Sequence, residues 1–188
     1  MEIKRNENKG RRYKMRLFHV SEECDISIFK PRIPTRKDMN QEKGLVWAIN
    51  EKCLPNFLTP RNCPRVTYHC NETTTEEDKR HFLSSSSASH VVAIEHKWFE
   101  IMRGTKLYLY EFDTSDFYLN DRSAGYYVSE KCQIPVNTII INDLFGELMR
   151  RKVEVRLIDN LWDLCEKIQK TSFDWSMCRM GFAEQKHG

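Results

Sequence analysis

The chain has 188 residues, of which 40% are hydrophobic and 30% are charged, as in an ordinary globular protein. A chain of this length can bury a sizeable core, so a single domain is the first expectation. No apolar run approaches the roughly 18 residues that a membrane span needs, and the first residues lack the apolar stretch of a secretion signal. We therefore expect a cytoplasmic protein that does not enter a membrane.

The N-terminal segment is the most basic part of the chain. Residues 1–16 hold seven lysines and arginines against two glutamates, a net +5, so the rest of the +3 chain carries −2. Residues 1–14 show no apolar periodicity, which predicts a disordered basic arm followed by a single domain over residues 15–188. A solvated tail is the simplest role for the arm, and contact with RNA or an anionic surface is the alternative.

Short strands and short helices follow the arm. The hydrophobic pattern predicts strands at 16–21, 45–49, 65–70, 90–95, 106–112, 126–129, 138–141 and 153–157. Helices are predicted at 50–57, 75–83, 96–102, 143–152 and 161–168, with N-caps at Asn50, Thr74, Asn142 and Asn160. Many short strands with few helices argue against a doubly wound parallel sheet. The pattern favours a compact α+β fold with a split or two-sheet β core.

The cysteines do not indicate disulfides or a metal site. There are seven, an odd number, and no CxxC pair occurs. Without a secretion signal they read as reduced thiols. Cys63, His69 and Cys70 are close in sequence, but a zinc site needs about four ligands at regular spacing, so no metal is expected. The common catalytic motifs and phosphate-binding glycine loops are also missing from the sequence.

Two loops carry arginines next to prolines, in the segments Pro31-Arg32-Ile33-Pro34-Thr35-Arg36 and Pro60-Arg61-Asn62-Cys63-Pro64-Arg65. Proline restricts the backbone, so these arginines are expected on rigid loops. The planar guanidinium fork suits phosphate and carboxylate groups. We therefore expect phosphate contacts from Arg32, Arg36, Arg61 and Arg65, with ordinary surface ion pairs as the alternative.

His19 is the histidine whose position most resembles that of a functional group. It stands between Phe18 and Val20 in a predicted strand, so its side chain points away from theirs. A histidine near the end of a strand, followed by Ser21, can bond a ribose or serve acid–base chemistry. A structural histidine is the alternative, and His69 and His90 carry the same ambiguity.

The strand Leu17-Phe18-His19-Val20-Ser21 resembles the opening strand of the ADP-ribosyltransferase-like fold. NAD-using toxins, poly-ADP-ribose polymerases and RNA 2′-phosphotransferases share that fold. Its histidine and small polar residue hold a ribose, which implies this role for His19 and Ser21. The segment Gly44-Leu45-Val46-Trp47-Ala48 resembles the second motif, with Trp47 in the usual place of a tyrosine. The resemblance implies that Trp47 stacks on a base or on nicotinamide.

The segment Gly125-Tyr126-Tyr127-Val128-Ser129, followed by Ile134-Pro135, resembles the third strand of the same fold, where a catalytic glutamate is expected. Here Gly125 or Tyr126 takes that place, and Glu130 comes five residues after Gly125. The resemblance makes His19 and Tyr126 the catalytic candidates and an NAD-like nucleotide the candidate cofactor. It implies glycosyl transfer from NAD or removal of a 2′-phosphate from RNA. The missing glutamate favours the alternative, a non-catalytic ligand-binding or interaction protein on the same scaffold.

A closer resemblance extends from His19 to Arg179. The segments HVSEE, PRxPxR and LPNFLTPRxCPRVTYH are similar to those of a small bacterial family of unknown function. This similarity implies no activity, so the expected function is binding of a nucleotide or another small phosphorylated ligand.

Overall fold

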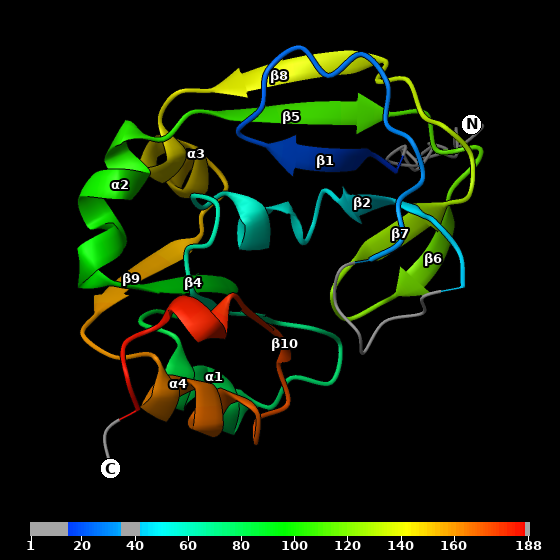
Figure 1. The fold of residues 1–188 in the computed structure, drawn as a ribbon. Helices are drawn as coiled ribbons and strands as arrows, with labels where there is room; N and C mark the ends of the chain where they lie inside the picture. Colours follow the sequence, from blue (N-terminus) through cyan, green and yellow to red (C-terminus); the bar gives the residue numbers. More distant parts are fainter. Residues whose placement is uncertain (1–14, 35–41, 187–188) are drawn as a thin grey trace, which may run out of the picture.

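The computed structural model describes residues 15–34 and 42–186, and these form two β-sheets (Figure 1). The six-stranded sheet has the order β6-β7-β2-β1-β5-β8, and the four-stranded sheet has the order β10-β3-β4-β9. The strands are β1 (Leu17–Ser21), β2 (Val46–Asn50), β3 (Arg65–His69), β4 (His90–Glu95), β5 (Leu107–Phe112), β6 (Tyr118–Asp121), β7 (Tyr126–Ser129), β8 (Asn137–Ile141), β9 (Glu154–Ile158) and β10 (Asp174–Cys178). The predicted α+β fold with a two-sheet core is confirmed.

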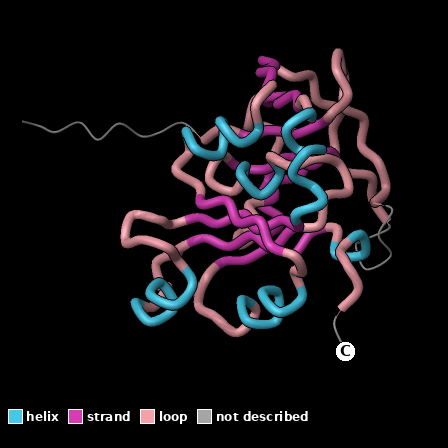
Figure 2. The backbone as a smooth tube through the Cα atoms, turned by 90° about the vertical axis from the view of Figure 1, so that its left-hand side faces the viewer, coloured by secondary structure: helices cyan, strands magenta, loops and turns pink. Residues whose placement is uncertain are grey.

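The helices are short and lie around the sheets. The α-helices are α1 (Glu76–Phe82), α2 (Phe99–Gly104), α3 (Leu144–Arg150) and α4 (Trp162–Ile168). Short 3-10 helices, each about one turn long, are η1 (Leu54–Phe57), η2 (His96–Trp98) and η3 (Met180–Phe182). Helices α1 and α4 lie beneath the four-stranded sheet in both views (Figures 1 and 2). None of the helices in the described part of the chain is long and apolar enough to cross a membrane.

The main core lies between the two sheets. Phe18 and Ile49 face Val92 and Ile94 of β4 across it, and helices α2 and α3 add apolar side chains to the same buried cluster. On β4 the alternate residues point the other way and pack beneath the sheet against α4. Full burial of one such side chain stabilises the fold by about 1.5–3 kcal/mol.

Strands β1 and β2 are paired over only part of their length. Leu17 pairs with Asn50 and Phe18 pairs with Ile49, whereas all five residues of β1 pair with β5. The two strands therefore separate beyond Phe18. This separation positions the candidate site described below.

Two predicted caps are displaced by one residue to a neighbour that also has a capping oxygen, and the predicted cap Asn160 lies one residue before Leu161, the N-cap of α4. Thr75, not Thr74, is the N-cap of α1 and accepts from the backbone N–H of Asp78. Asp143, not Asn142, caps α3 by accepting from the N–H of Gly146. In each pair the neighbouring residue offers the same kind of side-chain oxygen, so residue type alone does not choose between them.

Other elements also differ from the prediction. The helix expected over 50–57 is reduced to the 3-10 turn η1, which begins just before Pro55. Strands β6 and β10 were not predicted. All four residues of β6 are exposed, and no residue of β10 is fully buried, so neither carries the apolar pattern that marks a strand in a sequence.

Candidate functional site

The first feature of the site is the imidazole of His19, at the point where β1 and β2 separate. Its Nδ1 lies 3.1 Å from the carbonyl oxygen of Trp47, and its ring contacts that of Phe29 at 4.8 Å. Burial lowers the pKa of His19, and the positive charge of Arg32 lowers it further. The hydrogen bond to the Trp47 carbonyl acts in the opposite direction and raises this pKa. The ring is therefore neutral at pH 7. Because a carbonyl only accepts, Nδ1 carries the proton and Nε2 is left as an acceptor.

The loop after β1 is held against the sheet by backbone pairing. Phe29 pairs with Gln133, and Arg32 pairs with Leu45 through bonds of 3.2 and 3.0 Å. Gly44 permits this approach, since a Cβ there would lie 3.1 Å from the backbone of Pro31. The pairing places the exposed side chain of Arg32 close enough to affect the pKa of His19.

Three aromatic side chains form a cluster on the core-facing side of the same sheet. The rings of Trp47 and Tyr126 meet edge to face at 5.4 Å, and Phe57 of η1 lies 5.7 Å from Tyr126. All three are partly exposed. Alternation along β1 puts His19 on the face of Leu17, opposite this cluster, so its hydrogen bond reaches the backbone of Trp47 and not the indole.

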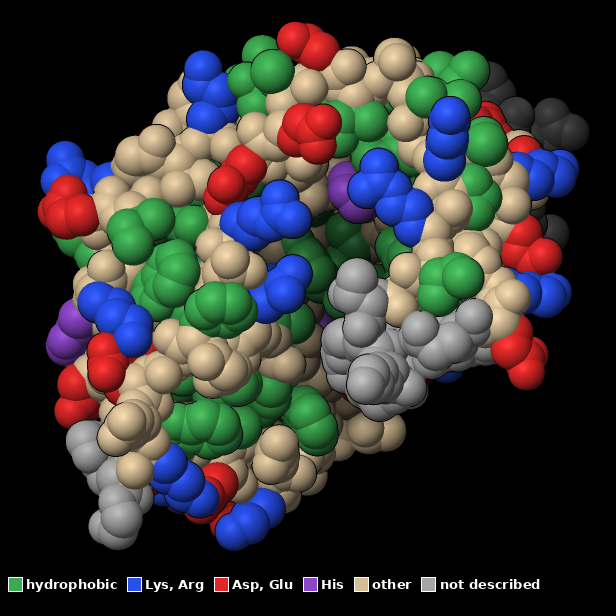
Figure 3. Space-filling model, in the orientation of Figure 1, with side chains coloured by type: hydrophobic (Ala, Val, Ile, Leu, Met, Phe, Trp, Pro, Cys, Tyr) green, Lys and Arg blue, Asp and Glu red, His purple; other side chains and the backbone are tan. Residues whose placement is uncertain are grey.

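The arginines expected to bind phosphate have different surroundings. Arg32 and Arg61 are exposed, and no carboxylate within residues 15–34 and 42–186 forms an ion pair with either guanidinium. The backbone N–H of Arg61 donates to Glu22 at 2.6 Å. Arg36 lies outside the described residues. Figure 3 shows a hollow in the face of the molecule that Figure 1 presents, with apolar side chains inside it and basic side chains around its rim.

Arg65 departs from the expectation of a phosphate contact. It is only 6% exposed, and its guanidinium donates to the carbonyls of Asn56 at 2.5 Å and Cys63 at 3.0 Å. The same group lies 5.2 Å from the ring centre of Phe57. These contacts join η1 to the start of β3, so Arg65 has a structural role.

Gly125, one of the two positions where the glutamate was expected, is sterically closed to it. Gly125 has a φ of +71°, and a Cβ there would lie 2.7 Å from both Cβ and Sγ of Cys53. A glutamate cannot occupy this position without moving the backbone. Ser21 keeps a hydroxyl beside the site, where its oxygen accepts from the N–H of Glu23. Glu130 is exposed and bonded to Lys43 at 3.0 Å, which lowers the pKa of its carboxyl group.

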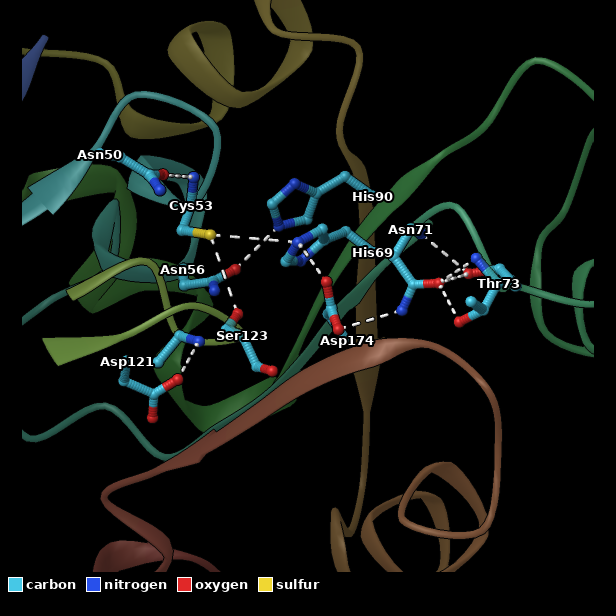
Figure 4. Close-up of polar contacts among 12 residues, drawn as sticks. Asn50, Cys53, Asn56, His69, Asn71, Thr73, His90, Asp121, Ser123 and Asp174 are labelled. Carbon is cyan, nitrogen blue, oxygen red and sulfur yellow. Dashed lines mark hydrogen bonds and ion pairs between the residues drawn. The ribbon is translucent and has the colours of Figure 1, made fainter. Parts of the chain in front are cut away.

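A second polar cluster crosses the four-stranded sheet (Figure 4). The register places Asp174 opposite His69 and His69 opposite His90. Nε2 of His69 lies 3.6 Å from Asp174 Oδ2 and 3.9 Å from Cys53 Sγ. The imidazoles of His69 and His90 are stacked, with their ring centres 5.0 Å apart. His90 Nε2 lies 2.8 Å from the amide oxygen of Asn56. Sequence reasoning missed this cluster, because nothing local indicates which strands are neighbours.

Burial lowers the pKa of His69 to about 4 and that of His90 to about 3, and the charge of Lys52 contributes to both shifts. Burial also raises the pKa of the Cys53 thiol to about 11. At pH 7 the two imidazoles are neutral and the thiol is protonated. Cys53 is therefore not an activated nucleophile in this arrangement.

The structure thus defines an α+β protein with two sheets, an exposed arginine near His19 where β1 and β2 separate, and a buried histidine pair. The chain belongs to a family of unknown function (DUF6886), whose model matches residues 18–183. Neither the curated proteins nor the solved structures contain a match to it. Membership of a family of unknown function is confirmed, whereas the resemblance to the ADP-ribosyltransferase-like fold gains no support from these comparisons.

Proposed function

We propose that the protein binds a nucleotide or another small phosphorylated ligand in the hollow beside His19, in the manner of an ADP-ribosyltransferase-like cleft. The observation that carries the proposal is the placement of Arg32. Its guanidinium is exposed and lies near His19, and no carboxylate in the described ranges forms an ion pair with it. A cation in this setting is available to a phosphate group.

The surrounding groups suit the other parts of a nucleotide. Nε2 of His19 can accept a hydrogen bond from a ribose hydroxyl, and the Ser21 hydroxyl can donate one. The partly exposed rings of Trp47 and Tyr126 offer a surface for a base or for nicotinamide. Because β1 and β2 separate beyond Phe18, a ligand at this end of the sheet can approach groups on both of its faces.

Ligand binding without rapid turnover fits these residues best. A catalytic glutamate would stabilise the oxocarbenium-like state of glycosyl transfer, and loss of such a group typically costs on the order of 10²–10³ in rate. Gly125 cannot be replaced by glutamate without strain, and Glu130 is engaged by Lys43. We expect release of nicotinamide from NAD at or near the background rate. Rapid release that persists in Glu130→Gln would exclude the non-catalytic assignment.

The test of binding is thermal unfolding with ADP-ribose, ADP, pyrophosphate or phosphate, compared with chloride at matched ionic strength. A ligand at a hundredfold excess over its Kd stabilises the folded state by about 2.7 kcal/mol. For a chain of this size, that corresponds to a rise in melting temperature of roughly 5–10 °C. At least one of the four phosphorylated compounds is expected to produce it.

Variants locate the binding. Arg32→Ala and Arg61→Ala are each expected to reduce the ligand-dependent rise in melting temperature. The matched control is Arg80→Ala, because Arg80 is exposed on α1 and contacts only its own helix. Equal melting temperatures in all five solutions would overturn the proposal. So would a ligand-dependent rise that both Arg32→Ala and Arg61→Ala leave unchanged.

A further inference from the structure

A separate pocket of about 370 Å³ opens beside the buried histidine pair. Its lining includes Lys52, Pro55, His69, Cys70, His90 and Arg151. The side chains come from η1 and the segment before it, from the ends of the two central strands β3 and β4, and from the end of α3. Pockets of 300–1,000 Å³ hold small organic molecules, so this one exceeds the needs of a single inorganic ion.

Among the described residues that line the pocket, one buried side-chain atom has no hydrogen-bond partner. His69 is 3% exposed, and its Nδ1 is buried without a hydrogen bond. Its other nitrogen, Nε2, faces Asp174 and Cys53. A buried polar atom without a partner costs free energy, and buried polar groups in proteins are nearly always bonded. Because Nε2 faces the acceptor-only carboxylate of Asp174, Nε2 carries the single proton of the neutral ring and Nδ1 is an acceptor. A ligand group that donates a hydrogen bond to Nδ1 would remove this cost.

The charges around the pocket favour an anion. Glu51 is engaged by Arg16 at 3.0 Å, and Arg151 is paired with Glu147 at 2.8 Å. Lys52 is exposed and makes no ion pair with a described carboxylate, so no carboxylate neutralises its positive charge. Burial of the imidazoles is the largest cause that lowers the pKa of His69 and His90, and the positive charge of Lys52 is a further cause for both. The Lys52 ammonium therefore acts on the space in front of the two imidazoles.

A metal ion does not fit the same side chains. Within the described ranges, no three histidine, cysteine, aspartate or glutamate side chains are arranged to hold one. We propose that the pocket binds a small organic anion, whose carboxylate or phosphate group contacts Lys52 and whose hydroxyl group donates to Nδ1 of His69. Its body lies against Pro55 and the imidazole of His90. This site is independent of the hollow beside His19.

The experiment uses meta-hydroxybenzoate and meta-hydroxyphenyl phosphate as probes, with meta-hydroxybenzyl alcohol as the uncharged analogue. Cys70 lines the pocket, so a bound probe should protect its thiol from N-ethylmaleimide. Mass spectrometry of the peptides gives the alkylation rate of each cysteine. We expect at least one of the two anions at saturation to slow alkylation of Cys70 severalfold. The exposed cysteines Cys24 and Cys132 are internal controls that should react unchanged.

Variants test the contacts by calorimetric titration of the protecting anion. Lys52→Met is expected to weaken binding at least tenfold, and His69→Gln is expected to weaken it as well. Lys106→Met is the matched control, since Lys106 is exposed and does not line the pocket. If His69→Gln does not fold, the affinity of Lys52→Met for the anion alone tests the proposed contact.

Three results would overturn the proposal: no protection of Cys70 by either anion, equal protection by meta-hydroxybenzyl alcohol, or unchanged affinity in Lys52→Met. The two sites are also distinguishable. Arg32→Ala and Arg61→Ala should leave the protection of Cys70 intact, and loss of protection in both would refute a separate site.

Discussion

His19 Nδ1 lies 3.1 Å from the carbonyl oxygen of Trp47, just beyond the last backbone pair between β1 and β2. The side chain of one strand therefore satisfies a carbonyl of the other strand where their pairing has ended. This bond, together with the contact between His19 and Phe29, holds the two strands and the following loop together.

We expect His19→Ala to lower the free energy of unfolding by about 1–2 kcal/mol, the usual cost of losing a partly buried hydrogen bond and leaving its acceptor unpaired. Urea denaturation measures the change. The control is His96→Ala, because the exposed His96 makes an equivalent bond of 3.0 Å to the Leu157 carbonyl. Its loss should cost less than about 0.5 kcal/mol, since water replaces the donor. Equal effects of the two substitutions would contradict this account.

Arg65→Met should destabilise the protein strongly, by about 2–4 kcal/mol in urea denaturation. Methionine retains an apolar side chain, but it leaves the carbonyls of Asn56 and Cys63 without their buried donor. Arg61→Met on the same loop should change the stability by less than about 0.5 kcal/mol, because Arg61 is exposed and its bond to Glu22 uses the backbone. A small effect of Arg65→Met would reopen the phosphate-binding role for this residue.

Gly125→Ala is expected to lower the melting temperature by several degrees. The positive φ disfavours any L side chain, and the added Cβ would come within 2.7 Å of Cys53. The effect should amount to at least about 1–2 kcal/mol. Gly104→Ala provides the comparison, because a Cβ at the end of α2 meets nothing within 4 Å. That variant should be neutral or slightly stabilised, and a comparable loss in both would refute the steric explanation.

The histidine pair should make stability depend on pH. The pKa values of His69 and His90 are lowered to about 4 and about 3, chiefly by burial, while both are near 6.5 in the unfolded chain. The unfolded chain therefore takes up protons first as the pH falls, and stability is lost below about pH 6.5. Between pH 7.5 and pH 5 each histidine should contribute about 2 kcal/mol to this loss.

Unfolding in urea at these two pH values measures the loss. His90→Gln should reduce the pH-dependent loss of stability by about 2 kcal/mol, since the titrating group is removed. His81→Gln is the matched control, because it makes the same substitution at an exposed histidine on α1, outside the buried pair. An unchanged loss in His90→Gln would show that other groups cause it.

The local pattern of hydrophobic and β-forming residues was sufficient to predict most of the individual strands and helices. Residues 45–49 and 65–70 are rich in apolar and β-forming side chains, and the strands Val46–Asn50 and Arg65–His69 lie there. The two-sheet α+β class follows from the number and shortness of such segments. The strand Tyr118–Asp121 was missed because a fully exposed edge strand has no apolar face to mark it.

The sequence by itself determined these local preferences and the charge of each segment. Only the tertiary structure decided that Arg65 is buried while Arg61, four residues earlier, is exposed. It also decided that Asp174, His69 and His90 share one row across three strands. The physical reason is that strand order and register depend on which distant apolar faces pack together, and such non-local contacts are not encoded by spacing along the chain.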